Sequence, residues 1–197
     1  FTDCIHRDLR TGALRVTKVL SSDLAPIRGI RALLGLGEGD PIPPAEVRMG
    51  TTLATNALLE RAGCPSVLVA NEGLGDLGTI GDQTRPELFA LAIEKPPRLP
   101  ETVVELGART AADGRLLRPL DPDALRDELR GAQKAGASSV AVSLIHAYLD
   151  GALERAAGEI AREVGFEHVS LSHEISNELG LLGRTDTTAA NAYLTPL

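Results

Sequence analysis

Two spacings of apolar residues run along the chain and predict strands and helices in turn. Short continuous apolar runs at residues 66–70 and 140–145 are typical of buried strands. Apolar residues three or four positions apart predict helices over residues 23–34, 121–135 and 150–164. Strands that alternate with helices of this length predict an α/β fold whose sheet contains parallel strands.

The two ends of the chain have different patterns. Residues 1–20 predict a β-hairpin, in which two strands flank a turn that contains glycine. Residues 101–197 form the regular α/β part, which ends in a helix. Within it, residues 103–106 and 115–117 flank Asp113-Gly114, and we therefore expect a second hairpin there.

The segment between them, residues 71–100, is rich in glycine and proline and has little periodicity. A loop of this length is usually functional or disordered. Its apolar residues, among them Leu88 and Phe89, argue against simple disorder because other groups must cover them. We therefore predict a long functional loop.

Composition excludes several classes of protein. The 197 residues suffice for one or two domains, and the net charge is −7, with lysine and arginine scattered along the chain. This charge, together with 3% aromatic residues and no tryptophan, argues against nucleic-acid binding. No apolar run approaches the roughly 20 residues of a membrane span. Cys4 and Cys64 follow no metal or redox spacing, and we expect free thiols in a reducing cytoplasm.

The first candidate site is a Gly-Thr-Thr turn that precedes a predicted helix. Thr51 or Thr52 can cap the helix by accepting a hydrogen bond from its free amides. Gly50 lets a ligand approach the backbone closely, and the positive end of the helix favours an anion. Asn56 can orient an amide carbonyl. The alternative is a capped helix that binds nothing.

Arg85 is the second candidate, because it precedes a proline within the long loop. Its guanidinium group can form a bidentate pair with a carboxylate substrate. The alternative is a surface arginine that forms a weak ion pair with Asp82 or Glu87.

Among the histidines, His146 is the best placed, since it follows an apolar run that predicts a buried strand. Ligands in parallel sheets gather at the carboxyl ends of the strands. A packing histidine is the alternative. His173 has no second histidine at metal-ligand spacing, which excludes a zinc site, and no Ser-His-Asp or Cys-His arrangement is evident.

Five segments, in order along the chain, resemble the hydantoinase/oxoprolinase family. The run GTTLATNALLER is similar to a signature of that family, and the block IGDQTRPELF is similar to a segment of its ATP-dependent 5-oxoprolinases. The segments lie at residues 1–3, 49–61, 80–96, 144–148 and 184–196. In the last of them, Gly183 replaces an acidic residue that many relatives carry, which leaves Arg184 and Asn191 as candidates.

The resemblance implies a ribonuclease-H-like lobe of the sugar-kinase/actin-like ATPase superfamily, incomplete at both ends. The glycines of the phosphate loop would precede Phe1, and the rest of the subunit would follow Leu197. The fragment alone should therefore be inactive. Its expected partners are the remainder of the same subunit or a second hydantoinase-type subunit, in an oligomer.

The resemblance also implies two cofactors, ATP and Mg²⁺. It places Thr2 and Asp3 at the edge of the loop that wraps the ATP phosphates, where Asp3 would reach the shell of the metal ion. It makes Thr51, Thr52 and Asn56 catalytic. The residues expected to bind substrate are Gly50, Arg85 and His146.

The implied reaction opens 5-oxoproline to glutamate, with ATP hydrolysis, through a phosphorylated lactam. An N-methylhydantoinase or a ketone carboxylase subunit would use related chemistry. The block that holds Gln83 and Arg85 favours 5-oxoproline. The alternative is that the chain is not catalytic at all: it would be an α/β fragment that only docks with a partner subunit.

Overall fold

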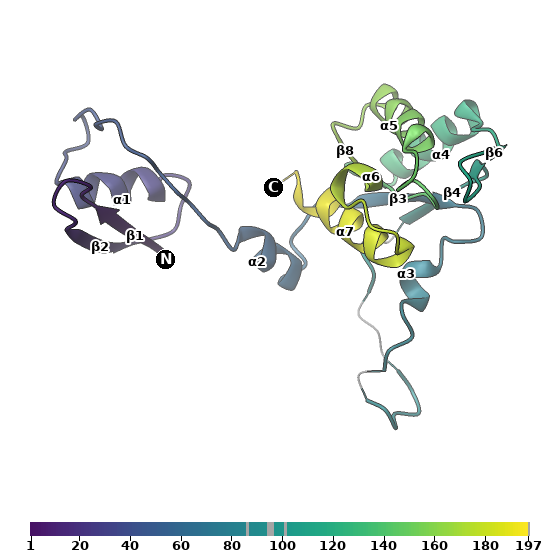
Figure 1. Ribbon diagram of the computed structural model, residues 1–197, viewed down its shortest axis with the longest axis horizontal. Coiled ribbons are helices and arrows are strands. Elements are labelled where there is room, and N and C mark those ends of the chain that lie inside the picture. The colour runs from purple at the N-terminus through teal and green to yellow at the C-terminus, as the bar shows by residue number, and fades with distance from the viewer. Residues whose placement is uncertain (86, 94–96, 101, 197) are drawn as a thin grey trace. The chain divides into compact units, whose positions relative to one another are not determined.

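The computed structural model describes residues 1–85, 87–93, 97–100 and 102–196. It divides into two compact units, Phe1–Gly50 and Thr51–Leu197. Figure 1 shows the elements of each unit, and we describe the two units separately.

The first unit is a two-stranded ribbon with one helix. Strands β1 (Thr2–Arg7) and β2 (Leu14–Val19) pair in antiparallel register, with Ile5 opposite Val16. Asp8 fixes the turn between them, because its Oδ1 accepts hydrogen bonds from the amides of Arg10 and Thr11 at 2.8 and 3.1 Å.

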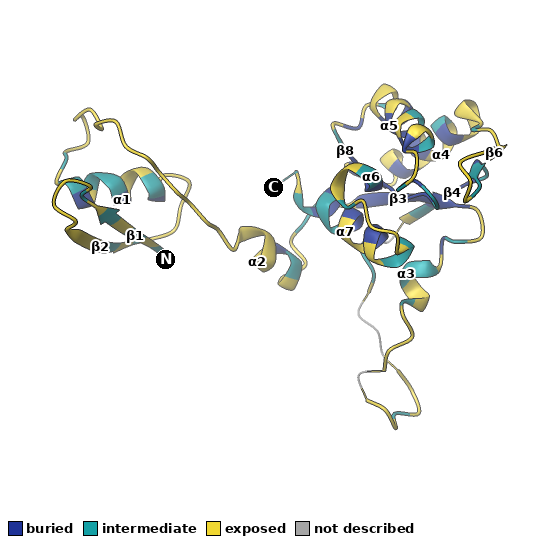
Figure 2. Ribbon diagram, viewed as in Figure 1, coloured by how far each residue is buried: buried dark blue, intermediate teal, exposed yellow. Residues whose placement is uncertain are grey.

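Helix α1 (Ala25–Leu34) packs on one face of this ribbon. The approach is close at Gly29, where a Cβ atom would lie 2.2 Å from the sulfur of Cys4. The opposite face of the ribbon is open to solvent, and the side chains of Ile5 and Val16 are about 70% exposed there (Figure 2). Residues 41–50, which follow the helix, form no regular element and are exposed.

The second unit is built on a four-stranded sheet in which every neighbouring pair of strands is parallel. The order across the sheet is β4-β3-β7-β8. The strands are β3 (Ser66–Asn71), β4 (Thr102–Leu106), β7 (Ser139–Val142) and β8 (His168–Leu171). The predicted α/β fold with parallel strands is therefore confirmed.

Helices cover both faces of this sheet (Figure 1). On one face, α4 (Pro122–Lys134) and α5 (Ala152–Val164) bury branched side chains that include Val69, Leu129 and Ile160. On the other face lies α7 (Leu181–Leu194). Small residues meet there, so this helix approaches the sheet closely; the buried set is Leu68, Ala70, Ala141 and Ala192.

Caps fix the ends of the longer helices. The Asp121 carboxylate accepts hydrogen bonds from the amides of Asp123 and Ala124 at the start of α4, both at 3.1 Å. Helix α5 ends at Gly165, whose φ of 111° favours glycine. None of the helices in the described part of the chain has the length and apolar character that a bilayer span requires.

Two expectations about short elements need correction. The second hairpin pairs β5 (Arg109–Thr110) with β6 (Leu116–Arg118), whereas residues 103–106 belong to β4. Val104 and Leu106 of this run are buried, although β4 is the edge strand of the parallel sheet. Segment 71–100 also contains one helical turn, α3 (Leu77–Ile80). The remaining short helices are α2 (Leu53–Leu59) and α6 (Ser172–Ile175).

Candidate functional site

The carboxyl edge of the sheet is where the fold predicts a ligand crevice. Strand β3 lies between β4 and β7: the chain runs from β3 to β4 on one side and then crosses back to β7 on the other, so the strand order reverses at this point. The buried side chain of Asn71 spans this point. Its Nδ2 donates to the carbonyl of Ala108 and its Oδ1 accepts from the amide of Ile145, both at 2.7 Å. The crevice between β3 and β7 is thus bridged by the protein itself.

Beside it lies a buried polar network, formed by Glu154, Ser172, His173 and Arg184. The Glu154 carboxylate is fully buried. One oxygen accepts from the amide of Leu144 at 2.8 Å and from the Ser172 hydroxyl at 2.5 Å. The other accepts from the amide of His173 at 3.0 Å and lies 2.6 Å from its Nδ1. All of these contacts hold α5 to the loop after β7 and to α6.

Arg184 is the cation of this network and is also fully buried. It donates to the Ser172 hydroxyl at 2.8 Å and to the carbonyls of Leu144 and Glu178 at 2.6 and 2.7 Å. Burial lowers the pKa of Arg184, and the nearby Glu154 carboxylate and Tyr148 oppose that shift. Its donors are directed at protein acceptors, so the network positions α7 and is not free to bind substrate.

His146 lies near this network, in the turn after β7. It is four residues beyond Val142, the last residue of that strand. Its φ of 63° is in the left-handed region, which is uncommon for a residue other than glycine. Its ring meets that of Tyr148 edge-on, with centroids 6.0 Å apart. Among the described residues, its buried Nδ1 atom has no hydrogen-bond partner.

The predicted helix follows the Gly-Thr-Thr turn, as expected, but its capping differs. Helix α2 begins at Leu53, and its N-cap residue, Thr52, makes no side-chain capping bond. Thr51 instead accepts a hydrogen bond from the amide of Leu53 at 3.1 Å. Both threonines and Asn56 are exposed. Gly50 ends the first unit, and a Cβ added there would meet no atom within 4 Å.

Thr2 and Asp3 occupy neighbouring positions in β1, and their side chains therefore point to opposite faces of the ribbon. The hydroxyl of Thr2 lies 3.1 Å from that of Ser21, and Asp3 forms an exposed ion pair with Lys18 at 3.3 Å. In this arrangement the two side chains do not fit a joint magnesium site. The described residues also contain no group of three acidic, histidine or cysteine side chains that could hold a metal ion.

Arg85 is exposed in the segment after α3. In the described part of the chain, no hydrogen bond or ion pair of its guanidinium group is present. Asp82, one of its expected partners, accepts hydrogen bonds from the amide and hydroxyl of Thr84 at 3.0 and 2.8 Å. Pro86 and residues 94–96, which belong to the same sequence block, lie outside the described residues.

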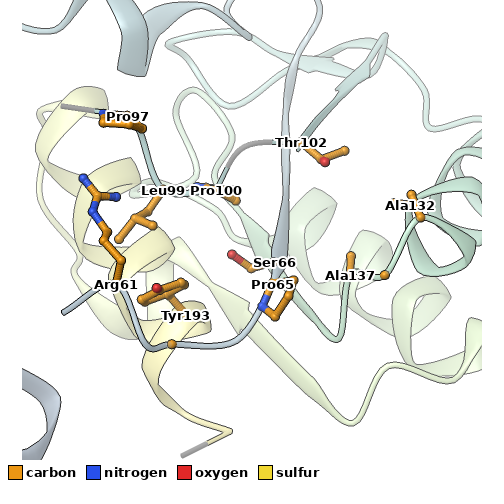
Figure 3. Close-up of a pocket in the computed structure, with 13 residues that line it drawn as sticks. Arg61, Pro65, Ser66, Pro97, Leu99, Pro100, Thr102, Ala132, Ala137 and Tyr193 are labelled. Atoms are coloured by element: carbon orange, nitrogen blue, oxygen red, sulfur yellow. The ribbon is translucent and has the colours of Figure 1, made fainter. Parts of the chain in front are cut away.

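A cavity lies at the opposite, amino edge of the sheet (Figure 3). Its volume is about 400 Å³. A second cavity, of about 350 Å³, shares four of its lining residues and continues along α7. The shared residues are Arg61, Pro97, Leu99 and Pro100. None of the predicted site residues lines either cavity.

Asp186 lines the second cavity from α7. Partial burial raises the pKa of its carboxyl group above the usual value, and the nearby Asp82 raises it further. Across the same cavity, Arg98 donates to the carbonyl of Gly75 at 2.6 Å. Sequence reasoning missed both cavities, because their residues come from separate segments and are mostly apolar.

Comparison with known proteins places this fold and these sequence blocks in a family. Residues 1–165 match the hydantoinase/oxoprolinase N-terminal region. The chain belongs to the hydantoinase/oxoprolinase family.

Within this family the chain is similar to enzymes of several activities. It is 36% identical to 5-oxoprolinase of Saccharomyces cerevisiae, over 100% of the chain and 19% of that protein. It is 34% identical to the acetophenone carboxylase gamma subunit of Aromatoleum aromaticum, over 82% of the chain and 24% of that protein. The crystal structure of ATP-dependent caprolactamase from Pseudomonas jessenii matches 100% of the chain and 30% of its own length, with 25% identity and a TM-score of 0.83.

The chain thus spans about a fifth of the length of the yeast relative. Among the described residues, no side-chain hydrogen bond or ion pair joins any two of the eight predicted site residues, and the one backbone bond between two of them runs from the amide of Asn56 to the carbonyl of Thr52 at 2.8 Å. The eight residues are Thr2, Asp3, Gly50, Thr51, Thr52, Asn56, Arg85 and His146.

Proposed function

We propose that this chain is part of an ATP-dependent cyclic amide hydrolase that opens 5-oxoproline to glutamate. The observation that carries this proposal is the 36% identity to yeast 5-oxoprolinase along the whole chain. The block around Arg85, which resembles 5-oxoprolinases, supports the same substrate. Because the relative is about five times longer, the activity would require further domains or subunits, and we expect an oligomer.

The chemical problem is the stability of the lactam, whose amide is resonance-stabilised and unstrained. Transfer of the γ-phosphoryl group of ATP to the lactam oxygen, with release of ADP, would make the ring carbon electrophilic. Water would then add to that carbon, and opening of the C–N bond would leave an acyl phosphate. A second water molecule would hydrolyse this acyl phosphate to glutamate and phosphate. In this scheme the protein contributes positioning and charge stabilisation.

Within this reaction we assign Thr51, Thr52 and Asn56 to the reacting amide. Their exposure at the start of α2 leaves the hydroxyl group of Thr52 and the side-chain amide of Asn56 accessible to a ligand. Gly50 would allow the ligand to approach the backbone, since nothing fills the space where a Cβ would lie.

The substrate carboxylate would bind Arg85, whose exposed guanidinium group makes no hydrogen bond in the described part of the chain. A bidentate pair would fix the orientation of the ring. His146 would contribute a second polar contact, because its Nδ1 atom has no partner among the described residues.

The remaining expectations concern the nucleotide and the fold. We propose that the first unit belongs to a ribonuclease-H-like lobe that binds ATP, with Thr2 and Asp3 near its phosphates. The support is the resemblance of Phe1-Thr2-Asp3 to the family's phosphate loop. The ion pair of Asp3 with Lys18 would have to open before Asp3 could approach a metal ion.

The test is the ATPase activity of the native gene product, purified with any subunit that accompanies it. ADP release is measured with 5-oxoproline, N-methylhydantoin, ε-caprolactam, or acetophenone with bicarbonate. We expect 5-oxoproline to stimulate ADP release most, with one glutamate formed per ADP. Stimulation by one of the other compounds alone would show that the substrate assignment is wrong.

A ketone carboxylase subunit is the second candidate. It is favoured by the 34% identity to the acetophenone carboxylase gamma subunit over 82% of the chain. The two candidates differ in the need for bicarbonate, because a carboxylase consumes it and a lactam hydrolase does not. Omitting bicarbonate from the assay above therefore separates them.

A further inference from the structure

The cavity of about 400 Å³ at the amino edge of the sheet contains a buried hydroxyl group that has no hydrogen-bond partner among the described residues. Ser66 is the first residue of β3 and is only 7% exposed. Its Oγ atom makes no hydrogen bond to any described residue. Figure 3 shows this side chain in the middle of the cavity lining, between Pro65 and the segment that holds Leu99. Because an unpaired buried hydroxyl destabilises a folded protein, such a group needs an explanation.

The walls of the cavity are apolar and well supported. The ring of Tyr193 forms one wall, and Leu99 another. Gly63 supports the ring, since a Cβ at that position would lie 2.1 Å from a ring carbon. The amide of Cys64 also donates to the carbonyl of Tyr193 at 2.9 Å. A volume of about 400 Å³ is within the range of small-molecule sites.

Arg61 supplies a positive charge at the rim of the cavity. It follows α2 with a φ of 55°, a conformation that glycine adopts more readily than arginine. The amide of Ala62 donates to the carbonyl of Ala57 at 2.9 Å and holds this turn. The Arg61 side chain is exposed and extends toward Pro97 (Figure 3). In the described part of the chain its guanidinium group forms no hydrogen bond or ion pair.

We propose that this cavity binds a small carboxylic acid with an apolar body and one amide or carbonyl group. The carboxylate would pair with Arg61, the apolar body would lie between Leu99 and Tyr193, and the Ser66 hydroxyl would bond to the amide or carbonyl. The site is distinct from the residues assigned to 5-oxoproline and lies at the opposite edge of the sheet from His146.

Three matched probes test the chemistry of this site: N-acetyl-L-leucine, its neutral amide N-acetyl-L-leucinamide, and N-acetylglycine. Binding to the 197-residue chain is followed by NMR titration at pH 7. We expect N-acetyl-L-leucine to bind with a Kd in the millimolar range and to shift the signals of Leu99 and Ala137. Loss of the carboxylate or of the isobutyl group should each weaken binding about tenfold. Equal binding of acid and amide, or no shift at these residues, overturns the proposal.

Two variants test the two polar groups separately. Arg61→Gln should abolish the preference for acid over amide, whereas the control Arg115→Gln, in the β5–β6 hairpin, should retain it. Ser66→Ala should weaken binding of N-acetyl-L-leucine about three- to tenfold. It should also raise the Tm of the ligand-free chain by about 1–3 °C, since it removes an unpaired buried hydroxyl. A lower Tm would mean that Ser66 already has a partner, which contradicts the proposal.

Discussion

The two units of the chain contain similar elements but bury them differently. In the second unit, helices cover both faces of a four-stranded parallel sheet, and Val67, Val69, Val140 and Val142 are fully buried. In the first unit, one helix covers one face of a two-stranded ribbon, and Ile5 and Val16 on the other face remain about 70% exposed. An isolated two-stranded hairpin is marginally stable in water, so the first unit depends on the packing of α1 against one face of its ribbon, whereas the four-stranded sheet is covered on both faces.

This difference bears on where chemistry can be placed. The second unit is rigid enough to hold buried polar groups, as the Glu154–Arg184 network shows. In the first unit the side chains of the predicted ATP-site residues Thr2 and Asp3 bond to neighbouring surface groups, Ser21 and Lys18. Functional geometry is best held by a well-packed support. The first unit would gain that support only by burying its open face.

The largest expected effect is on the stability of the second unit, through its buried network of Glu154, Ser172, His173 and Arg184. Arg184→Met would leave the buried Glu154 carboxylate without a compensating cation, and this should cost about 3–5 kcal/mol of unfolding free energy. The measurement is urea denaturation followed by circular dichroism. The control is Arg130→Met, since Arg130 is exposed and pairs with Asp127 on the surface of α4, and it should cost less than about 1 kcal/mol. Equal losses would mean that the network does not stabilise the unit.

A second prediction compares matched leucines in the two units. Leu129 is fully buried in the core of the second unit, and Leu33 is the most buried leucine of α1 in the first. Leu129→Ala should cost about 2–5 kcal/mol through lost burial and a cavity. Leu33→Ala should leave the unfolding of the second unit unchanged and broaden only the signals of residues 1–50. A large loss of global stability from Leu33→Ala would contradict the division into independent units.

The sequence predicted the second unit better than its candidate site. Apolar runs at residues 66–70 and 140–145 identified β3 and β7, because strands buried on both faces lack alternation. The run at 103–106 was assigned to a hairpin, since a short strand is compatible with either pairing until the rest of the sheet is known. Family resemblance was confirmed by the match over residues 1–165.

The site was harder to predict because its polar groups are defined by contacts between distant segments. Arg184 was a minor candidate, and only the fold shows it bonded to Ser172, Leu144 and Glu178. His173 was rejected as a metal ligand, and it pairs with Glu154, nineteen residues away. The amino-edge cavity had one weak signal in the sequence, a serine at the start of an apolar run. The roles proposed for Arg85 and His146 stay predictions.

The third prediction asks whether the second unit recognises substrate through Arg85. Lysine would keep the charge but lose the planar two-pronged geometry. A charge-assisted bidentate contact contributes about 1.5–3 kcal/mol, so Arg85→Lys should raise the KM for 5-oxoproline about ten- to a hundredfold. Because the contact would exist in both the ground and transition states, kcat should change less. Steady-state kinetics of the native gene product at saturating ATP give the answer, and an unaltered KM would return Arg85 to the surface-residue interpretation.

The smallest expected effect concerns Asp186 of the second unit, where burial and Asp82 raise the pKa of the carboxyl group. A raised pKa in the folded state means that the folded protein loses this proton less readily than the unfolded chain. The group therefore destabilises the fold progressively as pH rises above about 4, and it has no effect well below that pH, where both states are protonated.

Asp186→Asn should accordingly stabilise the second unit at pH 7 by a few tenths of a kcal/mol, a small value because the side chain is partly exposed to solvent. The gain should disappear at pH 3. Thermal unfolding of the wild-type chain and the variant across this range measures the difference, with Asp127→Asn, on the exposed face of α4, as the control that shows no such pH-dependent gain. A gain of equal size at pH 3 would assign the effect to packing of the amide, because protonation of Asp186 has already removed its charge at that pH.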